Sequence, residues 1–528
     1  MQRIRFVPTR INRRGFLAGT AMGAGLVAAG GLLFPRPGIA QSGRPVITHG
    51  VQSGDISAGR RAGQRAVIWS RADRPSRLHV EWSTTESFAE THRVQGPAAL
   101  PETDLTAKLD LDDLPAGQHI FYRVQFQDLG DVNVMSEPVI GSFRTAPGEK
   151  RDINFVWTGD TCGQGWGINL DWGGMKGYAT MLANDPAFMI HSGDNIYADG
   201  PIQEEVTLAD GTLWRNVVTE EKSKVAETLD DFRGNYKYNL TDTNVLAFNA
   251  AVPVFSQWDD HETVNNWYPN EVLLDDRYTE RSVALLSARS NRAFQEFMPT
   301  RQFAMDPERI HRTIHYGPSL DVFFLDMRRF RGNNSPNAQQ AAGGDAAFLG
   351  DDQIAWLKTA LLNSRATWKV IAADMPIGII VRDGETDFEN SSNGDGPVLG
   401  REHDIAEVLR FIHHNGIKNT VWLTADVHYT AAHYYDPNKA QFQDFSPFWE
   451  FVSGPIHAGS FGPGDMDNTF GPQVMYSKDP AGEANLPPSA GLQFFGHVHI
   501  DGATEVMTVT LKDIADQDLW SIDLQPEV

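Results

Sequence analysis

Four short segments, each an apolar run that breaks at an aspartate, restrict the possible fold of this chain more than any other feature. They are FVWTGDTCG (155–163), FMIHSGDNIY (188–197), VFSQWDDHE (254–262) and TVWLTADVHY (420–429). Short, nearly continuous apolar runs rich in β-branched and aromatic residues are typical of strands buried in an α/β sheet. Because ligands bind beyond the carboxyl ends of such strands, we expect the aspartates to converge on one crevice.

The chain beyond residue 147 alternates such runs with helical patterns, which predicts an α/β domain over 148–528. Apolar residues recur at helical spacing between Asp404 and His414, and Gly416 provides a stop signal. A second helix is expected between Gln353 and Leu362. Further strand-like runs at 322–325 and 370–372 are also followed by aspartates, Asp326 and Asp374.

The preceding region, residues 41–147, has only short alternating segments separated by turn-rich connections. Strands are expected at 65–70, 77–83, 105–111, 120–126 and 139–145. This pattern predicts a small all-β sandwich. The segment LPAGQHIFYRV (114–124) resembles the turn into a late strand of fibronectin type III domains, with Tyr122 as its corner tyrosine.

Residues 1–40 are typical of an export signal. Arg13 and Arg14 precede a Gly- and Ala-rich apolar run, and Gly38 and Ala40 supply small residues for cleavage. A membrane anchor is the alternative, but a span needs about 20 strongly apolar residues and glycine dilutes this run. We therefore predict a twin-arginine signal peptide, its export machinery as a transient partner, no stable membrane anchor, and a periplasmic or secreted protein.

The charge balance argues against a nucleic-acid-binding surface. The 528-residue chain has a formal net charge of −23, and residues 1–40 contain arginines but no acidic residue, so the remainder is more negative still. Such a surface repels nucleic acid and anionic membranes at long range. An anionic substrate would have to be bound by local cations. The single cysteine, Cys162, excludes an internal disulfide.

The residues collected by the four segments form a metal-ligand set: Asp160, Asp194, Tyr197, Asp260, His261, Asp426 and His428. Clustered carboxylates repel one another and become protonated unless cations neutralise them. Oxygen ligands with a phenolate and few imidazoles favour iron(III), manganese or calcium over zinc alone. Two metals about 3.5–4 Å apart would generate a hydroxide nucleophile and clamp a phosphoryl group.

The order of these motifs resembles the calcineurin-like metallophosphoesterase superfamily, and GDNIY is similar to its purple acid phosphatase version. The fuller pattern is closest to the PhoD-like alkaline phosphatase/phosphodiesterase family. It is carried by HGVQSGD (49–55), WDDHETVNN (258–266), LDMRRFR (325–331), WKVI (368–371) and DVHY (426–429). The resemblance implies a metallophosphoesterase-type αββα sandwich behind the small β-sandwich, with iron(III) and calcium as the expected ions and manganese or zinc as alternatives.

The resemblance also implies a role for each residue. Asp160 would bind the first metal, Asp194 would bridge two metals, and Tyr197 would bind iron as a phenolate. Asp260 would bind the second metal, and Asp426 with His428 would complete the ligand set. His261 would protonate the leaving group. Arg328 is expected to contact phosphate and Asn195 to act as an outer ligand, with structural hydrogen bonding as the alternative for both.

Two positions depart from the family pattern. PhoD-like proteins often place an iron-binding cysteine after the first strand, whereas here Asp160 stands in register and Cys162 follows two residues later. We favour Asp160, the form of the wider superfamily. The terminal GHVH (496–499) matches a superfamily metal motif, yet its position before an alternating run at 504–511 predicts that His497 and His499 lie within a sheet.

We therefore predict metal-dependent hydrolysis of a small phosphate ester, with a metal-bound hydroxide as nucleophile. Phosphodiester specificity of the phospholipase D type, or phosphotriester specificity, is the close alternative, because these reactions share the site chemistry. A non-catalytic calcium-binding exported protein is the remote alternative. The glycine- and tryptophan-rich segment 163–175 after the first ligand is either a packing loop or a wall of the substrate pocket.

Overall fold

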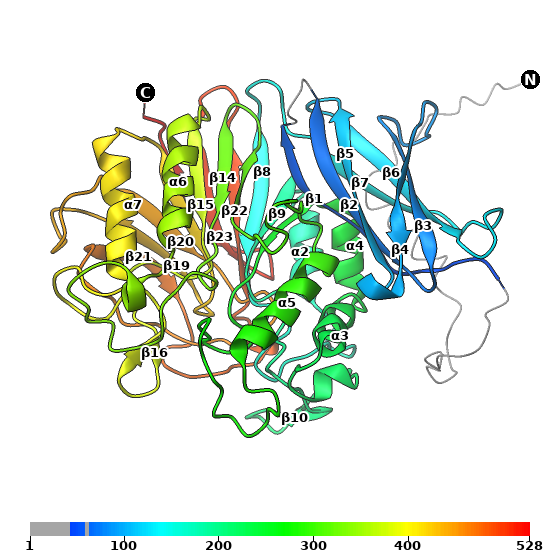
Figure 1. The fold of residues 1–528 in the computed structure, drawn as a ribbon. Helices are drawn as coiled ribbons and strands as arrows, with labels where there is room; N and C mark the ends of the chain where they lie inside the picture. Colours follow the sequence, from blue (N-terminus) through cyan, green and yellow to red (C-terminus); the bar gives the residue numbers. More distant parts are fainter. Residues whose placement is uncertain (1–42, 59–62, 528) are drawn as a thin grey trace, which may run out of the picture. The chain divides into compact units, whose positions relative to one another are not determined.

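The computed structural model describes residues 43–58 and 63–527, and the predicted signal peptide lies outside these residues. Pro45–Val528 forms one compact unit. No described helix is long and apolar enough to cross a membrane. The order of strands and helices confirms a mixed α/β chain that begins with a strand-rich region (Figure 1).

The strand-rich region consists of two antiparallel sheets. A three-stranded sheet has the order β1 (Ile47–Ala58), β2 (Gln64–Ala72), β5 (Thr106–Leu114). A four-stranded sheet has the order β4 (His92–Ala99), β3 (Ser76–Ser83), β6 (His119–Asp128), β7 (Val139–Arg144). The alternating residues of both sheets contribute to one apolar core, for example Ile68 and Val80. Strands β1 and β4 extend the set expected from sequence, and the likeness to fibronectin type III domains stays a prediction.

The rest of the chain is built on two larger sheets. The six-stranded sheet has the order β12 (Val254–Gln257), β9 (Phe188–Ser192), β8 (Ile153–Thr158), β22 (Phe494–Ile500), β23 (Met507–Asp513), β24 (Asp518–Leu524). The seven-stranded sheet has the order β13 (Arg312–His315), β14 (Leu320–Phe324), β15 (Trp368–Ala372), β18 (Thr420–Thr424), β20 (Phe448–Val452), β19 (Thr430–Tyr435), β21 (Pro472–Lys478). Two short ribbons complete the strands: β10 (Glu205–Thr207) with β11 (Leu213–Arg215), and β16 (Arg382–Asp383) with β17 (Asp387–Phe388).

Alternating side chains of the central strands divide between two apolar layers, which explains why these runs are apolar throughout. Phe155 and Trp157 of β8 share a core with Val370 and Leu423 of the other sheet, so the two sheets pack face to face. Val156 of β8 points the other way, into a core with the helices α2 (Lys176–Ala183), α3 (Leu229–Asn239), α4 (Thr243–Ala251) and α5 (Val283–Phe297).

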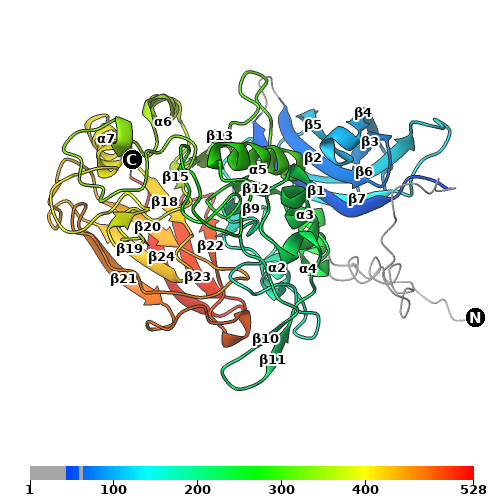
Figure 2. The ribbon, with the colours of Figure 1, turned by 60° about the horizontal axis from the view of Figure 1, so that its bottom comes forward.

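The seven-stranded sheet carries its own helices on the outer face. Phe323, Ile371 and Trp422 pack against α6 (Asp351–Asn363) and α7 (Glu402–His414), which lie side by side in Figure 1. Helix α7 buries Ile405, Val408, Leu409 and Ile412, as the helical spacing predicts. The result is a helix–sheet–sheet–helix arrangement, with the strands of both sheets visible together in Figure 2.

The alternation of strands and helices expected from sequence does not continue beyond β18. From β18 to β24 the described chain contains strands and one 3-10 turn but no α-helix. These strands pair largely antiparallel, as β19 does with β20 and β22 with β23. Antiparallel neighbours need only short connections, so no crossover helix is required.

Candidate metal and phosphate site

The carboxyl ends of strands from both sheets meet at one cavity of about 490 Å³. Strands β8 and β9 are parallel, as are β9 and β12, so the residues that follow them emerge at the same edge. Strands β14, β15 and β18 of the second sheet are parallel to one another as well. Asp194, Asp260, His261, Asp426 and His428, from loops of both sheets, line the cavity.

Buried and half-buried acidic and imidazole side chains form three adjoining groups, and within each group the potential ligand atoms lie within 4.8 Å of one another. The groups are Asp160 with Asp194 and His428, Asp194 with Asp260 and His261, and Asp259 with Asp260 and Asp426. Asp194 belongs to the first two groups and Asp260 to the last two. The side chains predicted from sequence are therefore brought together.

Four of these residues have left-handed backbone conformations. The φ angles are 65° for Asp160, 51° for Asp194, 66° for Asp426 and 61° for His428. Such conformations cost energy for residues other than glycine and are over-represented at functional sites. The turns that aim these side chains at the cavity are thus locally unfavourable.

The carboxylates are under-satisfied without cations. Neither oxygen of Asp160 has a hydrogen-bond partner among the described residues, and the same holds for Asp374, which follows β15. Burial, together with the charge of Asp259, raises the pKa of Asp160 well above its usual range. Burial and the neighbouring acids raise the pKa values of Asp194 and Asp426 likewise. The buried, unpartnered oxygens of Asp160, grouped with Asp194 and His428, fit a hard divalent or trivalent cation.

His428 is held in the form that binds cations. Its Nδ1 bonds the carbonyl oxygen of Gly459, which leaves Nε2 facing Tyr197 Oη at 2.8 Å and Asp160 Oδ1 at 3.5 Å. Burial lowers the pKa of His428 to about 4, so the imidazole is neutral. A backbone partner on the far nitrogen is the usual way to orient a ligating histidine.

Tyr197 lies between the two histidines of the site. Its hydroxyl contacts His428, and its ring stacks on His261 with centroids 4.2 Å apart. Gly163 packs so closely that a Cβ there would lie 2.3 Å from the tyrosine ring. Gly163 therefore packs against this tyrosine, while Gln164 of the same segment lines the cavity.

His261 is paired with an acid that the sequence reasoning missed. Asp199, from the same loop as Asp194, bonds His261 Nδ1 at 2.8 Å. Burial disfavours the imidazolium, but Asp199 and Asp260 outweigh burial and raise the pKa of His261 to about 10. The segment DNIYAD places this acid two residues after Tyr197, a signal that the motif itself contains.

Glu262 is a second missed residue, and it organises the ligand loops. Its Oε2 accepts hydrogen bonds from the backbone N–H of Asp259 at 2.7 Å and of Asp194 at 3.2 Å. Its Oε1 accepts from the backbone and side-chain amide of Asn195, at 2.5 Å and 2.9 Å. One carboxylate thus connects the loop after β9 to the loop after β12. Glu262 directly follows His261 in the chain.

Arg328 does not lie where a phosphate contact would. Its side chain is fully buried; Nε donates a hydrogen bond to Asp259 Oδ1 at 2.6 Å, and Nη2 forms an ion pair with Glu389 Oε1 at 2.5 Å. Further carboxylates, Asp260 and Asp374, lie 3.8 Å and 3.9 Å away. The surrounding acids outweigh burial and raise the pKa of Arg328 further. The guanidinium is therefore behind the carboxylates and is absent from the cavity lining.

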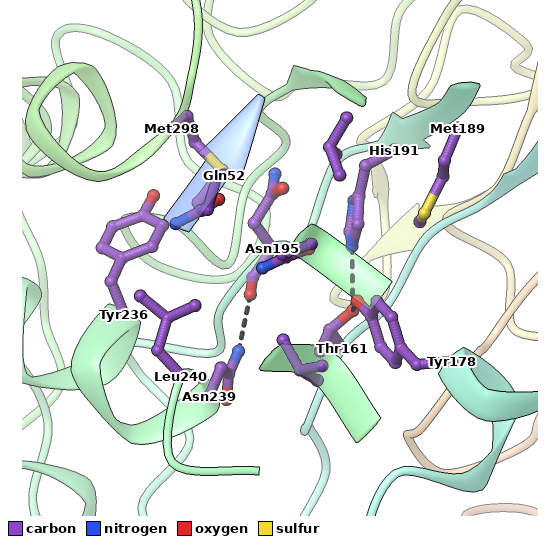
Figure 3. A pocket seen from close by; sticks show the side chains of 13 residues that line it. Gln52, Thr161, Tyr178, Met189, His191, Asn195, Tyr236, Asn239, Leu240 and Met298 are labelled. Carbon is purple, nitrogen blue, oxygen red and sulfur yellow. Dashed lines mark hydrogen bonds between the residues drawn. The ribbon is translucent and has the colours of Figure 1, made fainter. Parts of the chain in front are cut away.

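Asn195 points away from the open cavity, into a small enclosed one shown in Figure 3. Its side-chain nitrogen donates to the backbone carbonyl of Gln257 at 2.7 Å, and its backbone carbonyl accepts from the side-chain amide of Asn239. His191 lines the same space and bonds Thr161 Oγ1 at 2.8 Å. The contacts of Asn195 match the structural-hydrogen-bonding alternative.

Four other residues considered in the sequence analysis lie outside the three groups described above. Cys162 is buried in the apolar core with the outer helices, and burial raises the pKa of its thiol to about 12. His497 and His499 lie within β22, paired with β8 on one side and β23 on the other. Asp326 follows a strand as expected, but its Oδ1 accepts from Trp258 Nε1 at 2.9 Å and from two backbone amides of its own turn.

Comparisons with known proteins identify the class to which this fold and site belong. Residues 155–511 match the family model of the PhoD-like phosphatase, and residues 34–147 match that of the PhoD-like phosphatase N-terminal domain. The chain therefore belongs to the PhoD-like phosphatase family and is a phosphoric ester hydrolase. It is 27% identical over 445 residues to alkaline phosphatase D of Bacillus subtilis (strain 168), covering 79% of this chain and 70% of that protein.

Two solved structures share the fold. The structure of PhoD superposes with a TM-score of 0.66 at 20% identity, covering 93% of this chain and 94% of the other. The purple acid phosphatase PPD1 from yellow lupin (Lupinus luteus) seeds superposes with a TM-score of 0.54 at 11% identity, covering 92% and 74%. At these identities the likeness concerns the fold alone.

Proposed function

We propose that this protein hydrolyses phosphate esters with cations held by Asp160, Asp194, Tyr197, Asp260, Asp426 and His428. The observation that carries the proposal is the set of three adjoining ligand groups at one cavity, with Asp160 unpartnered among the described residues. Iron(III) and calcium suit the oxygen-rich set, and manganese or zinc are alternatives. When bound, such ions would supply an activated water and neutralise charge on the phosphoryl oxygens.

The protein's own residues would handle the leaving group. In hydrolysis a new bond forms between a water oxygen and phosphorus, and the bond from phosphorus to the ester oxygen breaks. His261, protonated and fixed by Asp199, would donate a proton to the departing oxygen. Tyr197 stacks on the imidazole and limits its rotation.

Arg328 has a different proposed role from the one expected by resemblance. Its contacts with Asp259 and Glu389 support the role of a buried counter-cation for these two acids. The proposal also includes the division of the chain into a twin-arginine signal peptide (1–40), a β-sandwich domain (41–147) and a catalytic domain (148–528). It includes export to the periplasm or beyond. Phosphodiester or phosphotriester specificity is the alternative to phosphomonoester specificity.

Elemental analysis of the purified protein, with a visible absorption spectrum and a matched pair of variants, tests this function. Asp194→Asn is expected to lose metal and activity together, because it removes a carboxylate shared by two groups. His261→Gln is expected to keep metal and to lose turnover by about 10²- to 10⁴-fold, the usual contribution of a general acid. Full activity in the Asp194 variant, or a metal-free active enzyme, would contradict the proposal.

A further inference from the structure

One arginine of the open cavity has no role in the proposed metal site. Among the described residues that line this cavity, Arg382 is the only arginine, and no lysine is present. Arg328 lies behind the carboxylates, where Asp259 and Glu389 engage it. The chain has a formal net charge of −23, so an exposed arginine in the lining of this cavity calls for an explanation.

The guanidinium of Arg382 is oriented without a carboxylate partner. It forms no ion pair or side-chain hydrogen bond with another described residue, although it lies over the ring of Phe388, 5.1 Å from the centroid. Phe388 is itself buried, so this ring is a fixed platform. A ring face orients a guanidinium without using its N–H groups. The donors of Arg382 therefore stay available for an anionic group of a ligand.

The short ribbon of β16 and β17, which carries Arg382, is fixed to the loop after β12. Asp383, the next residue, accepts hydrogen bonds from the side-chain amides of Asn266 at 3.1 Å and Asn334 at 2.8 Å. The backbone N–H of Asn266 in turn donates to Asp260 Oδ2 at 2.6 Å. Two hydrogen bonds through one residue thus connect the ribbon to a proposed cation ligand.

This attachment determines which part of a substrate meets Arg382. In the proposed function, the cations on the carboxylates neutralise the charge of the reacting phosphoryl group, so that group does not need Arg382. The loop after β12 also supplies His261, the proposed acid for the departing oxygen. Asn265 and Asn266 of this loop line the cavity together with His261 and Arg382. A leaving group whose oxygen lies at His261 therefore faces the wall that includes Arg382.

From these observations we propose that Arg382 selects phosphate esters whose leaving group carries an anionic group of its own, a carboxylate or a second phosphoryl group. The guanidinium binds this group through paired N–H donors, while Phe388 fixes its plane. Arg382 is thus a specificity-determining residue and takes no part in bond breaking. The inference rests on the proposed function of the same site.

The test compares two esters of matched shape, 3-carboxyphenyl phosphate and 3-carbamoylphenyl phosphate, on the metal-loaded full chain. Both are also measured as methyl diesters, so the result does not depend on which ester type is preferred. We expect the kcat/KM ratio, carboxylate over amide, to be at least about tenfold higher in the wild type than in Arg382→Gln, because a charge-assisted hydrogen bond gives such a factor. Comparing one ratio in two proteins cancels the difference in leaving-group acidity.

Further variants and one further ester locate the effect. Arg382→Lys keeps the charge but not the paired donors, so it should retain part of the ratio. Arg365→Gln, at an exposed arginine outside the cavity lining, is the matched control and should leave the ratio unchanged. The 3-phosphonophenyl ester, measured in the same way, distinguishes the two anionic groups, since the group that is recognised gives the larger Arg382-dependent ratio.

The possible failures are distinguishable. Good turnover with carboxylate and phosphonate ratios that are the same in the wild type and in Arg382→Gln, at equal metal content and Tm, would overturn the role of Arg382 and leave phosphoester hydrolysis intact. An equal loss of the ratio in Arg365→Gln would overturn the assignment to this cavity. No turnover of any ester by the metal-loaded wild type would overturn the proposed function itself.

Discussion

His261 and Asp199 form a pair whose geometry sets the protonation of the proposed acid. The imidazole Nδ1 lies 2.8 Å from the carboxylate, and His261 N also donates to Asp260 Oδ1 at 2.8 Å. The surrounding negative charge favours the imidazolium, which is the form that a general acid needs. Activity should therefore persist to alkaline pH and fall as pH rises through the pKa of His261.

The variant Asp199→Asn tests this coupling. It removes the largest favourable interaction of the imidazolium, so the pKa of His261 falls from about 10 and the alkaline limb of the kcat profile moves to lower pH. The measurement is kcat against pH on metal-loaded protein, with metal content determined in parallel. An alkaline limb that stays in place, at equal metal content, would contradict a role for His261 as the acid.

Arg328 should matter for stability at least as much as for catalysis. Arg328→Met removes the buried cation that contacts Asp259 and Glu389, and breaking such a network typically costs about 3–5 kcal/mol of the free energy of unfolding. Chemical denaturation checks this value. Arg365→Met, at an exposed arginine, is the control and should change stability by less than about 0.5 kcal/mol. Equal stability of both variants would refute the counter-cation role.

The sequence predicted the candidate ligand residues but not the side chains that contact them. Asp160, Asp194, Asp260 and Asp426 were recognisable because each follows an apolar run, and the structure gathers them. Asp326 also follows an apolar run, but its side chain accepts hydrogen bonds from Trp258 and from backbone amides of its own turn. What Arg328 contacts depends on Asp259 and Glu389, which are far from it in the chain, and no local pattern encodes such a contact.

Strand β1 links the small β-sheets to the larger ones. Asp55 of β1 is buried and bonds Arg312 of β13, with Oδ1 2.8 Å from Nη2, and it also accepts from the backbone of Arg301 at 2.6 Å. Gly54 is pressed against the chain here, since a Cβ would lie 2.5 Å from the carbonyl oxygens of Pro299 and Val254. The motif HGVQSGD therefore has a structural use at this junction.

Asp55→Asn should weaken the junction. The variant leaves Arg312 buried without its counter-charge, so we expect a loss of about 3–5 kcal/mol in the free energy of unfolding. Calorimetry detects the loss, and limited proteolysis should then cut between the strand-rich region and the remainder more readily. Asp112→Asn, at an exposed residue of β5, is the matched control. An unchanged Tm of the Asp55 variant would show that the ion pair between Asp55 and Arg312 does not contribute to stability.

Elements with strong local signals were the ones predicted well. Helix α7 follows from its apolar spacing and its glycine stop, and the parallel strands follow from their composition. The antiparallel strands β19, β20 and β21 lack such signals, because their pairing depends on contacts between distant segments and their residues include His433 and Glu450, which are buried but paired with each other.

The whole molecule should respond to metal removal in a pH-dependent way. Asp160, Asp194, Asp374 and Asp426 have pKa values raised by burial in the metal-free fold. Their folded state binds protons that the unfolded chain releases, so their contribution to stability is complete below the ordinary carboxyl pKa of about 4 and is lost as pH rises. Bound cations stabilise the ionised form and remove this dependence.

Calorimetry with and without a chelator tests the expectation between about pH 5 and pH 9. The Tm of chelated protein should fall as pH rises, so that its difference from metal-loaded protein grows. The double variant Asp160→Asn/Asp426→Asn should flatten the profile of the chelated protein. A chelator-induced change in Tm that is the same at every pH would contradict the proposal that these carboxylates cause the pH dependence.

The left-handed turns at Asp160, Asp194, Asp426 and His428 have a consequence for how this enzyme tolerates mutation. Glycine adopts these conformations without steric cost, so replacing any of the four would relax the backbone while deleting a ligand. In a library selected for heat resistance in the presence of a chelator, where the ligands bind no metal, glycine at these positions would be favoured over the native residues. Thermal selection of the metal-free protein would therefore erode the catalytic centre before the rest of the fold.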